Sequence, residues 1–197
     1  MTVALVTSVT WFSAAAQTPA GNIKDGEKKV AMCIGCHGII GYQASFPEIH
    51  KVPMIAGQGA KYIMAALTAY QKGERRHPTM RGIAQGLSEQ DMADLGAFYE
   101  ASGGPAANGD APAPTPPAPV AELLKKGNCA SCHGENLNKP IDPSYPKLAG
   151  QHGDYTEAQL VAFRSGARGN NPQMAAIAGK MNDREIKAVA DYIAGLR

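Results

Sequence analysis

The stretch CIGCHG occupies residues 33–38, and CASCHG repeats the same frame at residues 129–134. These two stretches hold all four cysteines of the chain, and a histidine directly follows each cysteine pair. The pattern C-x-x-C-H is typical of covalent c-type haem attachment, in which two thioether bonds hold the porphyrin and the next residue's imidazole binds the iron. The sequence therefore predicts two covalently bound haem c groups, each carrying an iron.

The motif assigns a role to each of its residues. The predicted thioether residues are Cys33 and Cys36 for the first haem, and Cys129 and Cys132 for the second. The predicted proximal iron ligands are His37 and His133. Each haem thus takes its attachment and one axial ligand from a single short segment.

Three other uses of a C-x-x-C pair fit less well. A zinc site needs about four ligands, so it would have to join the two motifs across the proline-rich segment between them. A thioredoxin-like redox pair belongs to a βαβ context, and no strand pattern stands out here. Structural disulfides suit an exported protein but leave the repeated histidine unexplained. We therefore favour haem attachment.

The second half of the chain repeats the first. PMIAGQGAKYIMAALTAYQKG, which begins at Pro53, matches PKLAGQHGDYTEAQLVAFRSG, which begins at Pro146, at a constant offset of 93. After one extra residue the match continues from Pro78 and from Pro172. This self-similarity predicts two copies of one unit.

A proline- and alanine-rich stretch separates the copies. Residues 103–119 read GGPAANGDAPAPTPPAP, and prolines lack the backbone donor that helices and sheets need. We interpret this stretch as a semi-rigid linker. It divides the chain into an N-terminal haem-binding domain over residues 17–102 and a C-terminal one over residues 120–197.

The beginning of the chain and the overall charge bear on location and partners. Residues 1–23 carry no charged side chain, and an apolar run leads to the small residues Ala14 to Ala16, which predicts a secretory signal peptide over residues 1–16. The net charge is only +2, and neither half is strongly basic. Nucleic acid binding therefore has no electrostatic support.

The apolar spacing predicts an all-α fold, with three helices in each copy. The first helix runs into the cysteine motif, over residues 24–36 or 121–132. The second begins near Tyr62 or Tyr155 and ends at Gly73 or Gly166. The third begins at Ser88 or Asn182, and Asp91 or Glu185 stands three residues later, as in a capping box.

Two methionines stand out as distal iron ligands. Of the eight methionines, only Met80 and Met174 occupy equivalent positions in both copies, 43 residues after His37 and 41 after His133. Both lie in a P-x-M segment that we expect to form a loop long enough to reach the opposite face of the porphyrin. We interpret the others as packing residues, including Met32, Met54, Met64, Met92 and Met181.

The remaining histidines do not repeat between the copies. His77 falls opposite Asn171 and His152 opposite Gly59, while His50 lies in an unmatched segment. We expect surface or local roles for all three. His77 is nevertheless the rival candidate for the distal ligand, because it lies only three residues before Met80.

At these residues the chain resembles class I c-type cytochromes, and PKLAGQ with DYTEAQLVAFRSGAR is similar to the dihaem cytochrome c4 group. The resemblance covers nearly all of residues 24–197 outside the linker. It implies an all-helical tandem of class I domains, export to the periplasm, and electron transfer through two haems with histidine and methionine ligands.

The resemblance also implies partners for the haems. A backbone carbonyl near Pro53 or Pro146 is expected to accept the Nδ1 proton of the proximal histidine. Arg75 and Arg168, with Gln58 and Gln151, occupy equivalent positions and are expected to meet haem propionates, although solvated surface charge is an equal alternative for the arginines. The long linker departs from that family and leaves the two domains free to move separately.

The favoured function is a periplasmic electron carrier rather than an enzyme. Its partners would be redox proteins. The donor would lie on the quinol or dehydrogenase side, and the acceptor would be a terminal oxidase or another redox protein. One of these partners could be bound to the membrane. The first alternative is a dedicated cytochrome subunit of a dehydrogenase complex. The second is a haem enzyme of the peroxidase or thiosulfate dehydrogenase type, which would require one iron with an unusual ligand.

Overall fold

The computed structural model describes residues 19–46, 48–103 and 114–196. The predicted signal peptide and most of the predicted linker lie outside these residues, and the domain boundaries stay predictions. We call residues 19–103 the N-terminal half and residues 114–196 the C-terminal half. In the described part of the chain, no helix is both long and apolar enough to cross a membrane.

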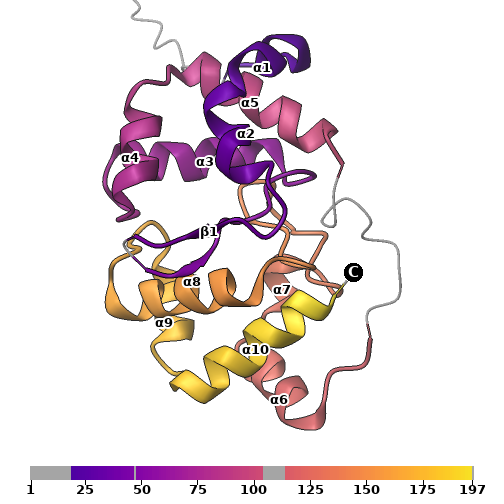
Figure 1. The fold of residues 1–197 in the computed structure, drawn as a ribbon. Helices are drawn as coiled ribbons and strands as arrows, with labels where there is room; N and C mark the ends of the chain where they lie inside the picture. The colour runs from indigo at the N-terminus through magenta and orange to yellow at the C-terminus, as the bar shows by residue number, and fades with distance from the viewer. Residues whose placement is uncertain (1–18, 47, 104–113, 197) are drawn as a thin grey trace, which may run out of the picture.

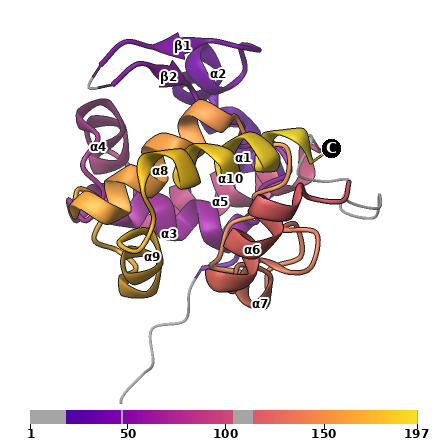
Figure 2. The ribbon, with the colours of Figure 1, turned by 90° about the horizontal axis from the view of Figure 1, so that it is seen from below.

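Helices make up most of both halves (Figure 1). The N-terminal half contains α1 (Ile23–Lys29), α2 (Ala31–His37), α3 (Ala60–Gln71), α4 (Pro78–Gln85) and α5 (Glu89–Ala101), with strands β1 (Gln43–Ala44) and β2 (His50–Lys51). The C-terminal half contains α6 (Ala118–Lys126), α7 (Ala130–His133), α8 (Gly153–Ser165), α9 (Pro172–Ala178) and α10 (Asp183–Gly195). The predicted all-α fold is confirmed. The short antiparallel hairpin was not predicted; it lies on the same side as α2 (Figure 2).

The last helix of each half begins as the sequence predicts. Ser88 caps α5 and Asn182 caps α10, and in both cases the side chain three residues on bonds back to the cap's backbone N–H. Gly73 and Gly166 follow the ends of α3 and α8 in the left-handed region, with φ of 75° and 76°. Glycine adopts that conformation without steric cost, which is why these helices end there.

The predicted first helix of each half is in fact two helices. Val30 separates α1 from α2, and Gly127 and Asn128 separate α6 from α7. Asn128 has a φ of 49°, a conformation that no helix continues through. Helix α6 also begins at Ala118, inside the stretch that the sequence assigns to the linker.

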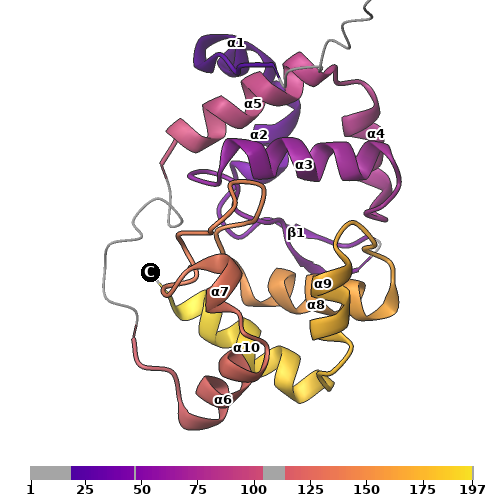
Figure 3. The ribbon, with the colours of Figure 1, turned by 180° about the vertical axis from the view of Figure 1, so that it is seen from behind.

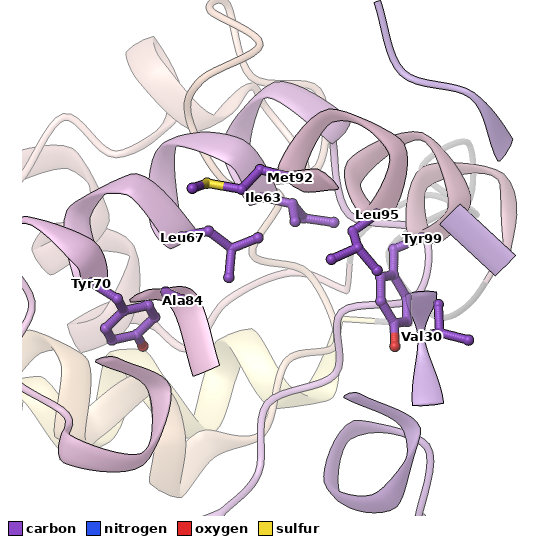
Figure 4. Close-up of a cluster of buried hydrophobic side chains, with 8 residues drawn as sticks. All are labelled: Val30, Ile63, Leu67, Tyr70, Ala84, Met92, Leu95 and Tyr99. Carbon is purple, nitrogen blue, oxygen red and sulfur yellow. The ribbon is translucent and has the colours of Figure 1, made fainter. Parts of the chain in front are cut away.

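Each half has its own apolar core. Figure 4 shows the N-terminal cluster, in which α3 and α5 contribute most of the side chains. Its members are Val30, Ile63, Leu67, Tyr70, Ala84, Met92, Leu95 and Tyr99. The C-terminal half has two clusters that share Met181 at their boundary, one around Val189 and Ile193 and one around Leu160 and Ile186.

Helices α1 and α5 cross closely at Gly26. A Cβ atom at this position would collide with the carbonyl oxygen of Asp94. Lys29, one turn later on α1, bridges Asp91 at 2.7 Å and Asp94 at 2.6 Å, and its hydrogen bonds hold the pKa of both carboxyls below their usual range. The crossing therefore combines backbone contact with charge-assisted hydrogen bonds.

Reciprocal contacts join the two halves. The Gln58 side chain donates to Lys147 O at 2.9 Å and accepts from Lys147 N–H at 2.9 Å. The Gln151 side chain likewise donates to Met54 O at 2.8 Å and accepts from Met54 N–H at 3.0 Å. We call these two arrangements the glutamine clamps.

Backbone pairing extends the contact between the halves. Arg75 and Arg168 form an antiparallel bridge, flanked by bonds from Arg76 N to Ala167 O at 3.0 Å and from Gly169 N to Glu74 O at 2.7 Å. The hairpin lies between the halves against α8, and the loop after α7 lies beneath α3 (Figure 3). The halves are therefore in direct contact, contrary to the expectation of separately moving domains.

The close crossing of α1 and α5 predicts that no side chain larger than that of glycine is tolerated at position 26 without a loss of stability. Gly26→Ala should lower the free energy of unfolding by about 1–3 kcal/mol, because the added methyl group must push α1 away from α5. Gly195→Ala is the matched control, since a Cβ on this helical glycine meets nothing within 4 Å. Urea unfolding of the two variants gives the comparison, and equal stability would contradict the crossing.

Candidate haem sites

The two cysteine motifs occupy short helices at equivalent places. Cys33, Cys36 and His37 belong to α2, whereas Cys129 precedes α7 and Cys132 and His133 lie in it. All four cysteines are half-buried and none forms a disulfide. Burial raises the pKa of Cys33 and Cys129 as thiols, the form that precedes haem attachment.

One hydrogen bond orients each predicted proximal histidine. His37 Nδ1 lies 2.8 Å from Pro53 O, and His133 Nδ1 lies 2.9 Å from Pro146 O. A carbonyl only accepts, so Nδ1 carries the proton in both rings and the lone pair is on Nε2. These are the backbone contacts that the resemblance implies.

Burial favours the neutral imidazole in both sites. It lowers the pKa of His37 and of His133, against the opposing effect of the bond to the proline carbonyl. His133 is also close enough to Arg168 for that charge to lower its pKa further. A neutral ring with its proton on Nδ1 is the form that binds a metal through Nε2.

The two predicted distal ligands lie in helices rather than in the expected loops. Met80 is the third residue of α4, and Met174 is the third residue of α9. A proline occupies the first position of each helix, where its missing N–H has no helical partner to lose. A capping residue followed by proline, His77–Pro78 or Asn171–Pro172, is the sequence signal for these helices. The helices themselves are too short for an apolar periodicity to indicate them.

His77 has a structural role in the described residues. Its Nδ1 accepts the backbone N–H of Met80 at 3.3 Å, and Asn171 Oδ1 accepts that of Met174 at 2.9 Å. His77 is thus the N-cap of α4, which Asn171 matches in the other half. This geometry gives His77 a local function, as expected for the non-repeating histidines.

The burial of His50 and of the other methionines tests the roles expected for them. His50 is only 5% exposed and lies against His77 and Tyr155, with ring centroids 6.4 and 5.7 Å away. Met92 is buried, and Met64 and Met181 pack partly against the cores. Met32 is 60% exposed, so the prediction that it packs was wrong.

Two buried arginines meet where the halves join. Arg75 is 3% exposed and Arg168 is 7% exposed, which contradicts the alternative of solvated surface charge. Both guanidinium groups donate to Gln159 Oε1 at 3.0 Å. Arg75 also donates to Tyr155 Oη at 3.0 Å, and Arg168 donates to Asn170 Oδ1 at 3.1 Å.

These arginines make a strongly positive environment. Each guanidinium stacks on an aromatic ring at 4.3 Å, Tyr70 for Arg75 and Phe163 for Arg168. Burial alone would raise the pKa of the Tyr62 hydroxyl, but the charges of Arg168 and Arg75 lower it to about 8. Among the described residues, no carboxylate forms an ion pair with either arginine.

The donors present fit two haem groups with ionised propionates. Burying a cation without an anionic partner is costly, and two neighbouring cations make the cost larger. The Tyr99 hydroxyl is buried beside Cys33, close enough for the two groups to shift each other's pKa, so its O–H lies next to the predicted attachment site of the first haem. Gln58 and Gln151 do not fit the expected contact with haem propionates. The amide groups of both side chains instead form hydrogen bonds with backbone groups across the interface.

Comparison with known proteins places these features in a family. A family model described as cytochrome c matches residues 117–197. Cytochrome c4 of Azotobacter vinelandii is 31% identical over an alignment of 203 positions, and the alignment covers 90% of each chain. A thiosulfate dehydrogenase electron acceptor of Stutzerimonas stutzeri is 36% identical over 183 residues, covering 87% of this chain and 82% of the relative.

A solved structure shares the arrangement of both halves. The crystal structure of reduced recombinant cytochrome c4 from Pseudomonas stutzeri matches with a TM-score of 0.69 and 30% sequence identity. The match covers 90% of this chain and all of that one. With two C-x-x-C-H motifs, two covalently bound haem c groups and this fold, the chain belongs to the cytochrome c4 family of dihaem class I cytochromes.

Proposed function

We propose that the protein carries electrons between redox proteins in the periplasm, through two haems that each have one histidine and one methionine ligand. The proposed ligands are His37 with Met80 and His133 with Met174. The observation that supports this best is the repeated histidine geometry. In both halves the histidine Nδ1 is hydrogen-bonded to a proline carbonyl, so Nε2 is the ring nitrogen available to iron.

The position of Met80 supports the ligand set of the first haem. Met80 and Cys33 pack against the same core cluster, although 47 residues separate them in the sequence. A thioether and an imidazole are a ligand pair of electron-transfer cytochromes, and methionine raises the reduction potential relative to stronger donors. A second protein ligand also leaves no iron position open to a substrate, which argues for a carrier rather than an enzyme.

The chemistry that a bound haem supplies is one-electron exchange between ferric and ferrous iron. The chain's residues determine how that exchange is used. The cysteines attach the group, the proline carbonyls orient the proximal rings, and the capped helices α4 and α9 hold the methionines. Because these contacts belong to packed elements, little should rearrange when the charge of the iron changes.

A dedicated role as the electron acceptor of a dehydrogenase is the second candidate. The relative from Stutzerimonas stutzeri that is 36% identical is a thiosulfate dehydrogenase electron acceptor. In the described residues, seven of the nine large exposed apolar side chains lie between Met32 and Ile49, around the first cysteine motif. Such an apolar surface suits transient docking of a redox protein more than long-range charge steering.

The function itself is tested on the secreted holoprotein. Its intact mass should equal the processed chain plus two haem groups, and a thiosulfate-oxidising dehydrogenase should reduce both haems in an anaerobic stopped-flow mixing experiment. A mass with fewer than two haems would contradict the carrier proposal. Stable co-purification with the dehydrogenase would favour a complex subunit, whereas comparable rates with several unrelated donors would favour a free carrier.

The ligand assignment predicts different outcomes for two neighbouring residues. Met80→Ala should remove about half of the weak far-red charge-transfer absorption of the ferric protein, because that band requires iron-bound methionine sulfur. His77→Asn should preserve the whole band, since Asn171 already caps the equivalent helix. The spectrum of each purified variant decides. An unchanged band in Met80→Ala would contradict ligation by Met80, and a stronger band in His77→Asn than in the wild type would assign the distal position to His77 instead.

The buried arginines predict an effect on both haem potentials. Arg75→Met and Arg168→Met should each lower the reduction potentials, because removing a nearby positive charge makes the ferric form more favourable. Tyr62→Phe is the control, since it removes the 3.4 Å hydrogen bond to Arg168 but no charge. Potentiometric titration measures the shifts. Unchanged potentials in both arginine variants would rule out propionates as the counter-charges.

A further inference from the structure

A single peptide group lies between each proximal histidine and a glutamine of the opposite half. In the N-terminal half this group joins Pro53 to Met54. Its carbonyl oxygen accepts from His37 Nδ1 at 2.8 Å, and its N–H donates to Gln151 Oε1 at 3.0 Å. The two side chains therefore bind opposite ends of one planar, conjugated unit.

The C-terminal half repeats the arrangement with the roles exchanged. The peptide group joins Pro146 to Lys147, its oxygen accepts from His133 Nδ1 at 2.9 Å, and its N–H donates to Gln58 Oε1 at 2.9 Å. Each half thus supplies the glutamine that completes the other half's site. Only the side chain at the second residue differs, methionine in one case and lysine in the other.

The glutamines are held in one orientation. Each Oε1 also accepts the N–H of the residue that follows it, Gly59 for Gln58 at 3.1 Å and His152 for Gln151 at 3.0 Å. Each Nε2 donates to the carbonyl of the clamped residue. Gln58 is only 4% exposed, so water does not substitute easily for the bonds of this side chain.

We propose that Gln58 and Gln151 are positioning residues for the proximal histidine of the opposite half. This inference rests on the proposed ligation by His37 and His133. A hydrogen bond at the N–H end of a peptide group polarises it and makes its carbonyl oxygen a better acceptor. The glutamine therefore strengthens the bond to the histidine Nδ1 proton and holds the carbonyl in place.

The expected electronic effect follows from ligand basicity. A stronger bond at Nδ1 raises the basicity of the imidazole, which favours ferric iron and lowers the reduction potential. Without the glutamine, the bond at Nδ1 weakens and the potential of the opposite haem rises. The effect crosses the interface, so each half sets a property of the other.

Two matched variants of the dihaem holoprotein test the proposal, Gln151→Met and Gln58→Met. Each removes one clamp while keeping a side chain of similar length. The primary measurement is the residue-assigned NMR signal of each histidine Nδ1–H in the reduced, diamagnetic protein. Gln151→Met should move the His37 signal upfield and speed its exchange with solvent while His133 stays unchanged, and Gln58→Met should do the reverse.

The crossed pattern separates positioning from general loosening of the interface. Loosening would affect both histidines alike in either variant, and that outcome would overturn the proposal, as would an effect on the histidine of the same half or no effect. Potentiometric titration should show one of the two potentials raised in each variant. If a methionine variant does not accumulate, the asparagine variant at the same position, Gln58→Asn or Gln151→Asn, replaces it. The same crossed pattern of histidine Nδ1–H signals is then expected.

Failure of this inference is distinguishable from failure of the proposed function. The wild-type protein first has to show two haems by mass and methionine ligation by its far-red band. A wild type that fails there refutes the ligand set. A wild type that passes, combined with variants that lack the crossed pattern, refutes only the role of the glutamines.

Discussion

The hydrogen bond from each proximal histidine to a proline carbonyl is the contact on which both sites depend. It selects the tautomer with the lone pair on Nε2, and it ties the cysteine motif to the proline segment that follows it in the sequence. The α2 and α7 helices are seven and four residues long, and the hydrogen bond gives each histidine a second point of attachment outside its helix.

The interface between the halves is built on unusual electrostatics. Arg75 and Arg168 are buried next to each other, and their hydrogen bonds go to neutral groups such as Gln159 and Tyr155. The lowered pKa of Tyr62 reports the resulting positive field. Anionic propionates would remove this imbalance, so haem binding and the association of the halves should stabilise each other.

The features that were predicted from the sequence are the ones with local signals. The C-x-x-C-H frames, the capping boxes at Ser88 and Asn182, and the glycines after α3 and α8 act within a few residues, and such signals are readable without a structure. Comparing the two copies also singled out Met80 and Met174. Their helices were missed because seven or eight residues show too little periodicity, although the Asn171–Pro172 pair marks a helix start.

The contacts between the halves were not predictable in the same way. The partners in the glutamine clamps are 89 and 97 residues apart, and their acceptors and donors are backbone groups that carry no sequence identity. A proline-rich segment suggested separation, because composition describes the connection and not the surfaces that it connects. The repeat correctly marked Gln58 and Gln151 as equivalent, but it did not indicate what they bind.

The backbone bridge at Arg75 and Arg168 has the reciprocity of an isologous dimer contact, yet both sides belong to one polypeptide. An equivalent pair of separate molecules would dissociate on dilution. Here the two surfaces stay at a high effective concentration that the connecting segment sets, however scarce the protein becomes. Even at low protein concentration, the two redox centres therefore stay together in a ratio of one to one.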